Sequence, residues 1–195
     1  RSLAEAADGS IWVGTQGLAR VEPDTLAIED SVLPALHDKP VLSLQPAGPR
    51  LVIGTYDGIY RYDIRTRVLE HAGHVPNDPS SLASDTVRHI AKVGNDWWYG
   101  TSRGLSIASG DSLPRRFTNL RHRAGESSSL PQDLIGSISS GPHGQVWVST
   151  FGGLGVADPP VDGEAWKFQT IGLAQGLSSD KVNAVLADDR GRLWA

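Results

Sequence analysis

One short pattern recurs along the chain and limits the folds that the chain can adopt. In each complete copy an apolar run is followed by Gly or Ser, then by Thr, and then by a Gly-Leu or Gly-Ile pair. The apolar run contains a Trp or Val, here called the anchor, at positions 12, 52, 98, 147 and 194. The intervals between anchors are 40, 46, 49 and 47 residues. Repeats of this length, with four short strands each, are typical of propellers. The sequence therefore predicts an all-β fold, a β-propeller or partial propeller with four four-stranded blades plus the first half of a fifth.

Residues 1–195 are expected to form one domain, with blades at about 1–34, 35–80, 81–129 and 130–176 and a partial blade at 177–195. The second strand of each unit is apolar on consecutive residues, as in Trp97-Trp98-Tyr99, which indicates that both of its faces are covered. First strands are expected at Val41–Leu44, Thr86–Ile90, Leu134–Ile138 and Val182–Leu186. Weaker fourth strands are expected at Leu26–Ile28, Val68–Glu70, Arg116–Thr118 and Trp166–Gln169. No segment holds a helical apolar period over ten or more residues.

The connections between units repeat as well. A leucine precedes the first apolar residue of the next unit by five positions, at Leu36, Leu82, Leu130 and Leu177. We expect these leucines to fill the gap between adjacent blades. Asp85, Asp133 and Asp180 precede the same apolar residue by two positions. Their equivalent placement favours bonds to backbone N–H groups over a carboxylate ring for acid–base or metal chemistry.

Composition excludes several classes of protein. The net charge of −4 with 21% charged residues does not favour nucleic acid or a membrane surface as partner. The absence of cysteine excludes disulfides and Cys-based zinc sites. No apolar run approaches the ~20 residues that span a bilayer. The sequence begins at Arg1, lacks Met and ends inside a repeat, so we expect a piece of a longer propeller, or open ends covered by another copy.

These motifs together resemble the two-component regulator propeller repeat. The resemblance rests on the anchor Trp, Gly-Thr and Gly-Leu, on the connections 77–85, 127–133 and 175–180, and on Asp188–Trp194 as the opening of a further blade. Val52 in place of the anchor Trp and Ser149 in place of Gly depart from the pattern. The resemblance implies a periplasmic sensor module of a bacterial histidine kinase, hybrid sensor or diguanylate cyclase. The rest of such a receptor would cross the membrane, and this piece would be non-catalytic.

The turns between second and third strands vary between repeats, so a ligand pocket is expected there. The candidate ligand-binding residues are Gln16, Tyr56, Asp57, Ser102, Arg103 and Phe151. Tyr56 offers a stacking surface, and Asp57 and Arg103 offer opposite charges for a polar, carbohydrate-like or peptide ligand. The alternative, which the variation alone favours, is that these are ordinary solvated turn residues. Exposed turn substitutions usually change stability by no more than about 0.5 kcal/mol, so replacing Tyr56, Asp57 and Arg103 by alanine should leave folding nearly intact. No catalytic residue, metal site or cofactor is predicted.

Other candidate residues have simpler structural explanations. The anchor tryptophans are expected in the core rather than as sugar platforms. The histidines at 37, 71, 74, 89, 122 and 143 form no metal-like set, and His89 alone is a candidate for the central channel. The basic run Arg115, Arg116, Arg121, His122 and Arg123 could meet an acidic ligand, but a solvated strand is favoured. A scaffold for protein interaction or homodimerisation, and a propeller lyase or hydrolase, stay open as alternative functions.

Overall fold

The computed structural model describes residues 2–30, 32–141, 144–161, 164–188 and 190–195, and His143 lies outside these ranges. It contains four four-stranded antiparallel sheets and one two-stranded sheet. Blade 1 is β1 (Ser2–Glu5), β2 (Ile11–Gly14), β3 (Leu18–Val21) and β4 (Ile28–Glu29); blade 2 is β5 (Val41–Ala47), β6 (Arg50–Thr55), β7 (Ile59–Asp63) and β8 (Leu69–Ala72). Blade 3 is β9 (Val87–Val93), β10 (Asp96–Thr101), β11 (Gly104–Ser109) and β12 (Thr118–Leu120); blade 4 is β13 (Ile135–Ser140), β14 (Val146–Thr150), β15 (Gly153–Ala157) and β16 (Gln169–Ile171). The partial blade is β17 (Leu186–Ala187) and β18 (Leu193–Trp194).

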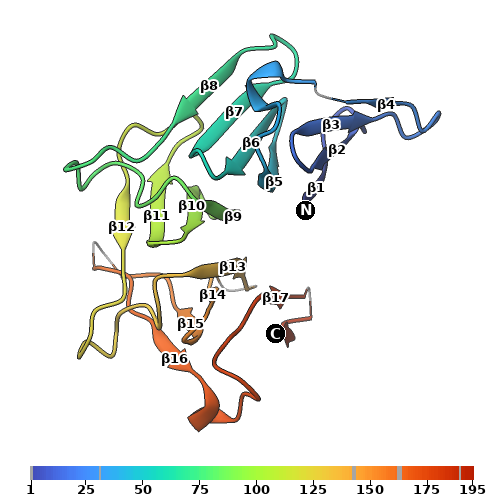
Figure 1. Ribbon diagram of the computed structural model, residues 1–195. Coiled ribbons are helices and arrows are strands. Elements are labelled where there is room, and N and C mark those ends of the chain that lie inside the picture. The colour runs from blue at the N-terminus through green and yellow to red at the C-terminus, as the bar shows by residue number, and fades with distance from the viewer. Residues whose placement is uncertain (1, 31, 142–143, 162–163, 189) are drawn as a thin grey trace.

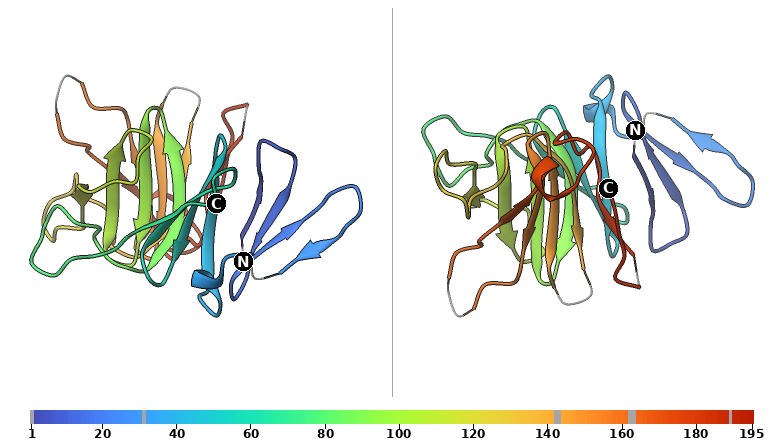
Figure 2. Two further views of the ribbon diagram at one scale, coloured as in Figure 1. Left: turned by 90° about the horizontal axis from the view of Figure 1, so that it is seen from above. Right: turned by 90° about the horizontal axis from the view of Figure 1, so that it is seen from below.

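The blades are arranged as in a propeller. Viewed along the axis, the first strands β1, β5, β9, β13 and β17 surround a common centre and the fourth strands lie at the periphery (Figure 1). The two perpendicular views show the blades side by side (Figure 2). The predicted fold, four four-stranded blades and the first half of a fifth, is therefore confirmed. Two three-residue 3-10 turns, Pro34–Leu36 and Leu173–Gln175, were not expected and lie in connections between blades.

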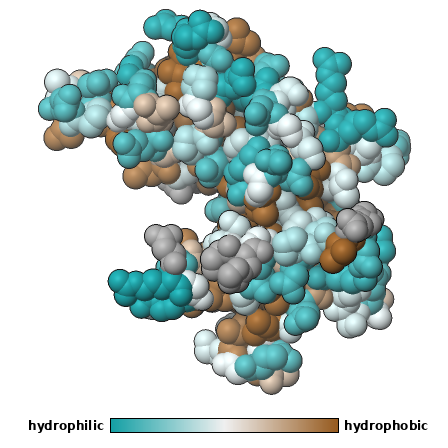
Figure 3. Space-filling view, turned by 180° about the vertical axis from the view of Figure 1, so that it is seen from behind, coloured by the Kyte–Doolittle hydropathy of each residue, from teal (hydrophilic) through white to brown (hydrophobic). Residues whose placement is uncertain are grey.

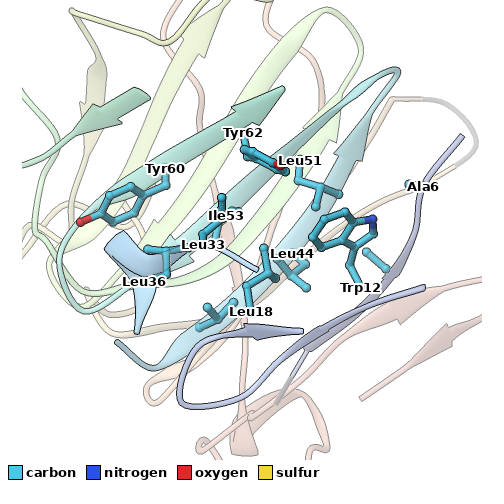
Figure 4. Close-up of a cluster of buried hydrophobic side chains, with 12 residues drawn as sticks. Ala6, Trp12, Leu18, Leu33, Leu36, Leu44, Leu51, Ile53, Tyr60 and Tyr62 are labelled. Carbon is cyan, nitrogen blue, oxygen red and sulfur yellow. The ribbon is translucent and has the colours of Figure 1, made fainter. Parts of the chain in front are cut away.

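Apolar clusters between successive blades hold the arc together. Leu36, Leu82 and Leu130 are each at most 1% exposed. Leu36 belongs to one buried cluster with Trp12 of blade 1 and Ile53 of blade 2, which Figure 4 shows. The other two leucines occupy the next two junctions. Leu177 is only partly buried against blade 4. The expected role of these leucines is confirmed at three junctions.

Hydrogen bonds between first strands add a second link between blades. Ser43, His89 and Ser137 occupy the same repeat position, and each side chain accepts a bond from a backbone N–H of the next blade. The donors are Ile90 at 3.0 Å, Ile138 at 3.3 Å and Val185 at 2.7 Å, respectively. His89 bonds through Nδ1, so this nitrogen carries no proton. The candidate channel residue is thus part of the joint between blades 3 and 4.

The second strands are buried on both faces where a blade has two neighbours. In β6 and β10 every residue after the first is buried. In β2 burial alternates, because blade 1 has a neighbouring blade on one side only. Trp12 and Trp98 are core residues as predicted, Trp147 is partly buried, and Trp194 of the partial blade is 58% exposed.

The fourth strands begin later than the sequence predicted. Leu26 and Arg67 have positive φ angles of 56° and 61° and belong to turns. In blades 3 and 4, the buried Phe117 and Phe168 donate their N–H groups to Ser80 and Ser128 of the preceding connections, not to the third strand. The first strand expected at Val182–Leu186 was also misplaced, because pairing with β18 begins only at Leu186.

Candidate functional site

The candidate site lies on the face where the turn between the second and third strands of a blade meets the connection to the next blade. We call the first feature the b–c turn and the second the crossing. The N–H groups of Gly58, Gly104 and Gly153 donate to the carbonyl oxygens of Asp85, Asp133 and Asp180 at 2.7–2.8 Å. Sequence reasoning placed b–c turns and crossings on one face, and these bonds confirm it.

The repeated threonine and glycine shape each b–c turn. The hydroxyl of Thr55 donates to the Gly58 carbonyl at 3.0 Å and accepts from the Asp57 N–H at 2.9 Å. Thr101 and Thr150 make the same pair of bonds in the next two blades. Gly58, Gly104 and Gly153 have φ between 85° and 122°, a region that favours glycine. The turn backbone is therefore constant, and its intervening side chains can vary.

The crossing aspartates have the structural role that their spacing predicted. Oδ1 of Asp85 accepts from the His74 N–H at 2.6 Å, and Oδ1 of Asp133 accepts from the His122 N–H at 2.7 Å. Asp180 accepts from the Leu173 N–H at 2.8 Å. Each aspartate thus ties the end of one blade to the b–c turn of that blade. Among the described residues, no group of three or more His, Cys, Asp or Glu could hold a metal ion.

Blade 2 departs from this frame. Lys39 precedes Val41 by two positions and so occupies the place that aspartate has in the other three crossings. Its Nζ forms an ion pair with Asp57 and donates to the Tyr60 hydroxyl at 3.1 Å, and that hydroxyl donates to Oδ2 of Asp57 at 2.7 Å. We call Lys39, Asp57, Tyr60 and His71 the blade 2 cluster.

His71 completes the cluster from the edge strand β8. Its Nε2 donates to the backbone carbonyl of Asp57 at 2.6 Å, and its ring lies 4.5 Å from the Tyr60 ring, centroid to centroid. Tyr60 is only 6% exposed and packs in the core between blades 1 and 2. Figure 4 shows its hydroxyl pointing away from the apolar side chains. Tyr60 is thus a core residue whose hydroxyl reaches the face of the b–c turns and crossings, where it bonds to Lys39 and Asp57.

The charges of the cluster stabilise one another. The hydrogen bond from Lys39, followed by that from Tyr60, lowers the pKa of Asp57. The bond to Asp57, followed by that to Tyr60, raises the pKa of Lys39. Burial, followed by the bond to Asp57, raises the pKa of Tyr60. At neutral pH the cluster therefore holds an ammonium, a carboxylate and a neutral phenol, which together offer hydrogen-bond donors and acceptors to a ligand.

The structure brings only some of the predicted site residues into contact with other functional groups. Tyr56 is 51% exposed beside Asp57, and Gln16 and Arg103 are also exposed. Asp57 pairs with Lys39 and not with Arg103. The Ser102 hydroxyl lies 2.8 Å from that of Ser84, and Phe151 forms a bridge with Gly153 in its own turn.

Asp57 is therefore not an ordinary solvated turn residue. Its replacement would leave Lys39 and the Tyr60 hydroxyl without their carboxylate, so the expectation of nearly intact folding holds for Tyr56 and Arg103 but not for Asp57. Sequence reasoning missed Lys39, Tyr60 and His71. The available signal was Lys39 itself, a reversal of charge at a position where the other crossings carry aspartate.

No protein-family model matches the sequence, and no curated protein matches it either. The fold is similar to the extracellular domain of the hybrid two-component system BT3049 from B. thetaiotaomicron, with a TM-score of 0.74 and 23% identity. That likeness covers 98% of this chain, which spans 25% of the BT3049 chain. PorZ, a surface component of the type-IX secretion system of Porphyromonas gingivalis, is similar over 97% of this chain and 29% of its own, with a TM-score of 0.72 and 14% identity.

An enzyme has a similar fold too. Virginiamycin B lyase from Staphylococcus aureus gives a TM-score of 0.68 at 14% identity over 99% of this chain and 61% of its own. At these identities the likenesses establish the β-propeller fold and leave the function to the site.

Proposed function

We propose that this chain is part of a ligand-sensing propeller of the two-component regulator type. It would be the extracytoplasmic, periplasmic module of a membrane-anchored bacterial receptor, a histidine kinase or a diguanylate cyclase, without catalysis of its own. The observation that carries the proposal is the blade 2 cluster, where a charge-reversed crossing residue and a variable b–c turn form a polar group beside the exposed Tyr56. The repeat motifs of the sequence and the similarity to the BT3049 extracellular domain support it.

The cluster suits a small polar molecule such as a sugar. The ring of Tyr56 offers a face for stacking, the Lys39 ammonium donates hydrogen bonds, and the Asp57 carboxylate accepts them. Lys39 lies on the crossing from blade 1, whereas Asp57 and Tyr60 belong to blade 2. A ligand that competes for these bonds would therefore act on the junction between two blades. This coupling gives a physical route from binding to a change in the arrangement of blades.

Signalling by full-length receptor variants tests the proposal. Tyr56→Ala should abolish the response and leave the melting temperature nearly unchanged, because the side chain is half exposed. Val68→Ala is a matched control, since Val68 is 53% exposed and lies in the turn between β7 and β8. A normal response from a stable Tyr56→Ala receptor would contradict the proposal and would favour a scaffold or dimerisation role.

A further inference from the structure

Basic residues around the fourth strand of blade 3 take no part in the blade 2 cluster. Arg115, Arg116, Arg121 and Arg123 are all exposed. Arg123 pairs with Glu126 at 3.3 Å. The other three form no ion pair with any residue that the structure describes. In a chain with a net charge of −4, this is a local excess of positive charge.

A pocket of about 490 Å³ lies beside Arg121, between the crossing that enters blade 3 and strand β12. We call it the blade 3 rim pocket, and His74, Asn77, Asp78, Asn119 and Arg121 supply its polar lining. The amide of Asn119 donates to the carbonyl oxygens of Pro79 and Ser81, each at 2.8 Å, and so fixes the crossing against the strand. The volume falls in the range of small-molecule sites, about 300–1,000 Å³.

The Arg121 guanidinium is the group in the lining that suits an anion. Asp78 is the one carboxylate in the lining, and its Oδ1 accepts from the hydroxyl and the N–H of Ser80 at 2.7 and 2.9 Å. These two bonds, with a smaller contribution from Arg116, lower the pKa of Asp78. Asp78 and Arg121 form no ion pair in the part of the chain that the structure describes, so the Arg121 guanidinium stays available to an anion.

The neighbouring b–c turn carries a second arginine, Arg103, which lies outside the pocket lining. A Cβ atom placed on Gly104 would lie 3.2 Å from Cγ of Arg121, so the stem of Arg121 runs alongside the turn that carries Arg103. The same repeat positions form the ion pair of Lys39 and Asp57 in blade 2. In blade 3 they hold Asp85 and Arg103, and Asp85 accepts a backbone bond from His74 instead.

We propose that the blade 3 rim pocket binds the anionic group of a small molecule, a carboxylate, sulfate or phosphate. Arg121 would be the principal ligand through charge-assisted, bidentate hydrogen bonds, and Arg103 would strengthen the positive field. The proposed occupant is a small molecule, because the pocket volume falls in the range of small-molecule sites. This inference does not rest on the proposed function, since the pocket can bind an anion whether or not Tyr56 and Asp57 hold a signal.

Thermal unfolding of the full-length protein tests the inference with acetate, sulfate and phosphate as probes and chloride at matched ionic strength as reference. An anion at concentration c stabilises the folded state by RT ln(1 + c/Kd), so the melting temperature rises with anion concentration and reports the affinity. Sulfate and phosphate also stabilise proteins by exclusion from their surface, so the difference between variants is the informative quantity.

Arg121→Ala should weaken the apparent affinity by about tenfold or more, as expected for loss of a charge-assisted contact. Arg121→Lys should give an intermediate loss. Arg123→Ala removes the same charge two residues away, from a side chain already paired with Glu126, and should leave the affinity within about twofold of the original. Equal anion dependence in the original protein and Arg121→Ala, or no effect beyond that of chloride, would overturn the inference.

Discussion

His89 differs from its repeat equivalents in the chemistry of one hydrogen bond. Ser43 and Ser137 accept the interblade bond through a hydroxyl at any pH, whereas Nδ1 of His89 accepts only when the imidazole is neutral. Burial lowers the pKa of His89 from its ordinary value of 6.5. The flanking strands β5 and β13 carry no ionisable side chain, and β9 and β10 carry Arg88, Lys92, Asp96 and Tyr99. The joint between blades 3 and 4 is thus sensitive to protons.

This joint predicts a loss of stability in acid. Because the pKa of His89 is lower in the folded state, its contribution is complete above 6.5 and declines as the pH falls through the lower folded value. His89→Ser keeps an acceptor and should reduce that loss. Urea unfolding at about pH 7.5 and about pH 5.5 would measure it. If His89→Ser lost as much stability in acid as the original protein, the joint would not be the cause.

Trp98 and Trp194 hold the same repeat position in different surroundings. Trp98 is fully buried and meets the Trp166 ring edge-to-face at 4.8 Å, whereas Trp194 is 58% exposed. We expect Trp98→Ala to lower the free energy of unfolding by about 3–5 kcal/mol. Trp194→Ala should cost less than about 1 kcal/mol. Urea midpoints of the two variants would compare them, and equal losses would contradict this assignment of the core.

At the scale of the element, the b–c turn depends on its glycine. Gly104 has φ of 105°, and a Cβ there would collide with the backbone carbonyl of Leu120 on β12. Gly94, in the turn between β9 and β10, has φ of 57° and no atom within 4 Å of a built Cβ. Gly94→Ala should therefore carry only the backbone strain, about 1–2 kcal/mol.

Gly104→Ala should cost more than Gly94→Ala, because it adds the collision to the strain. Thermal or urea unfolding of the two variants would give the difference. If Gly104→Ala lowered the free energy of unfolding by no more than Gly94→Ala does, strand β12 would be able to move away from the turn at little cost.

The sequence predicted those elements whose residues repeat, because a repeated position has the same neighbours in each blade. The leucines at 36, 82 and 130 and the aspartates at 85, 133 and 180 were identified in this way. The fourth strands were placed too early, because Phe117 and Phe168 look like strand residues but bond to a crossing. Lys39 was missed for the opposite reason. It differs from the aspartate that the other crossings carry, and a comparison of the residues that match between repeats does not identify a residue that differs.

At the scale of the whole molecule, the repeats alone were sufficient to predict the arc of blades. The junctions between blades 2 and 3 and between blades 3 and 4 each combine a buried leucine, an apolar cluster and a bond between first strands. Exposed apolar residues remain at the two ends of the arc, with Leu3 at 69% and Leu186 at 62% exposure. Seen from behind, the surface is otherwise largely hydrophilic, with separate apolar patches (Figure 3). The described helices include none long and apolar enough to cross a membrane.

In the proposed function, Lys39 and Asp57, which differ from the equivalent residues of the other blades, serve ligand sensing and not folding. The double change Lys39→Asp and Asp57→Arg tests it most directly, because blade 3 carries these same residues at Asp85 and Arg103. The measurement is the signalling output of the full-length receptor, together with its melting temperature. We predict a folded receptor that no longer responds, and because the exchanged charges can still pair, its melting temperature falls less than that of Asp57→Ala. A folded receptor with a normal response would contradict the account.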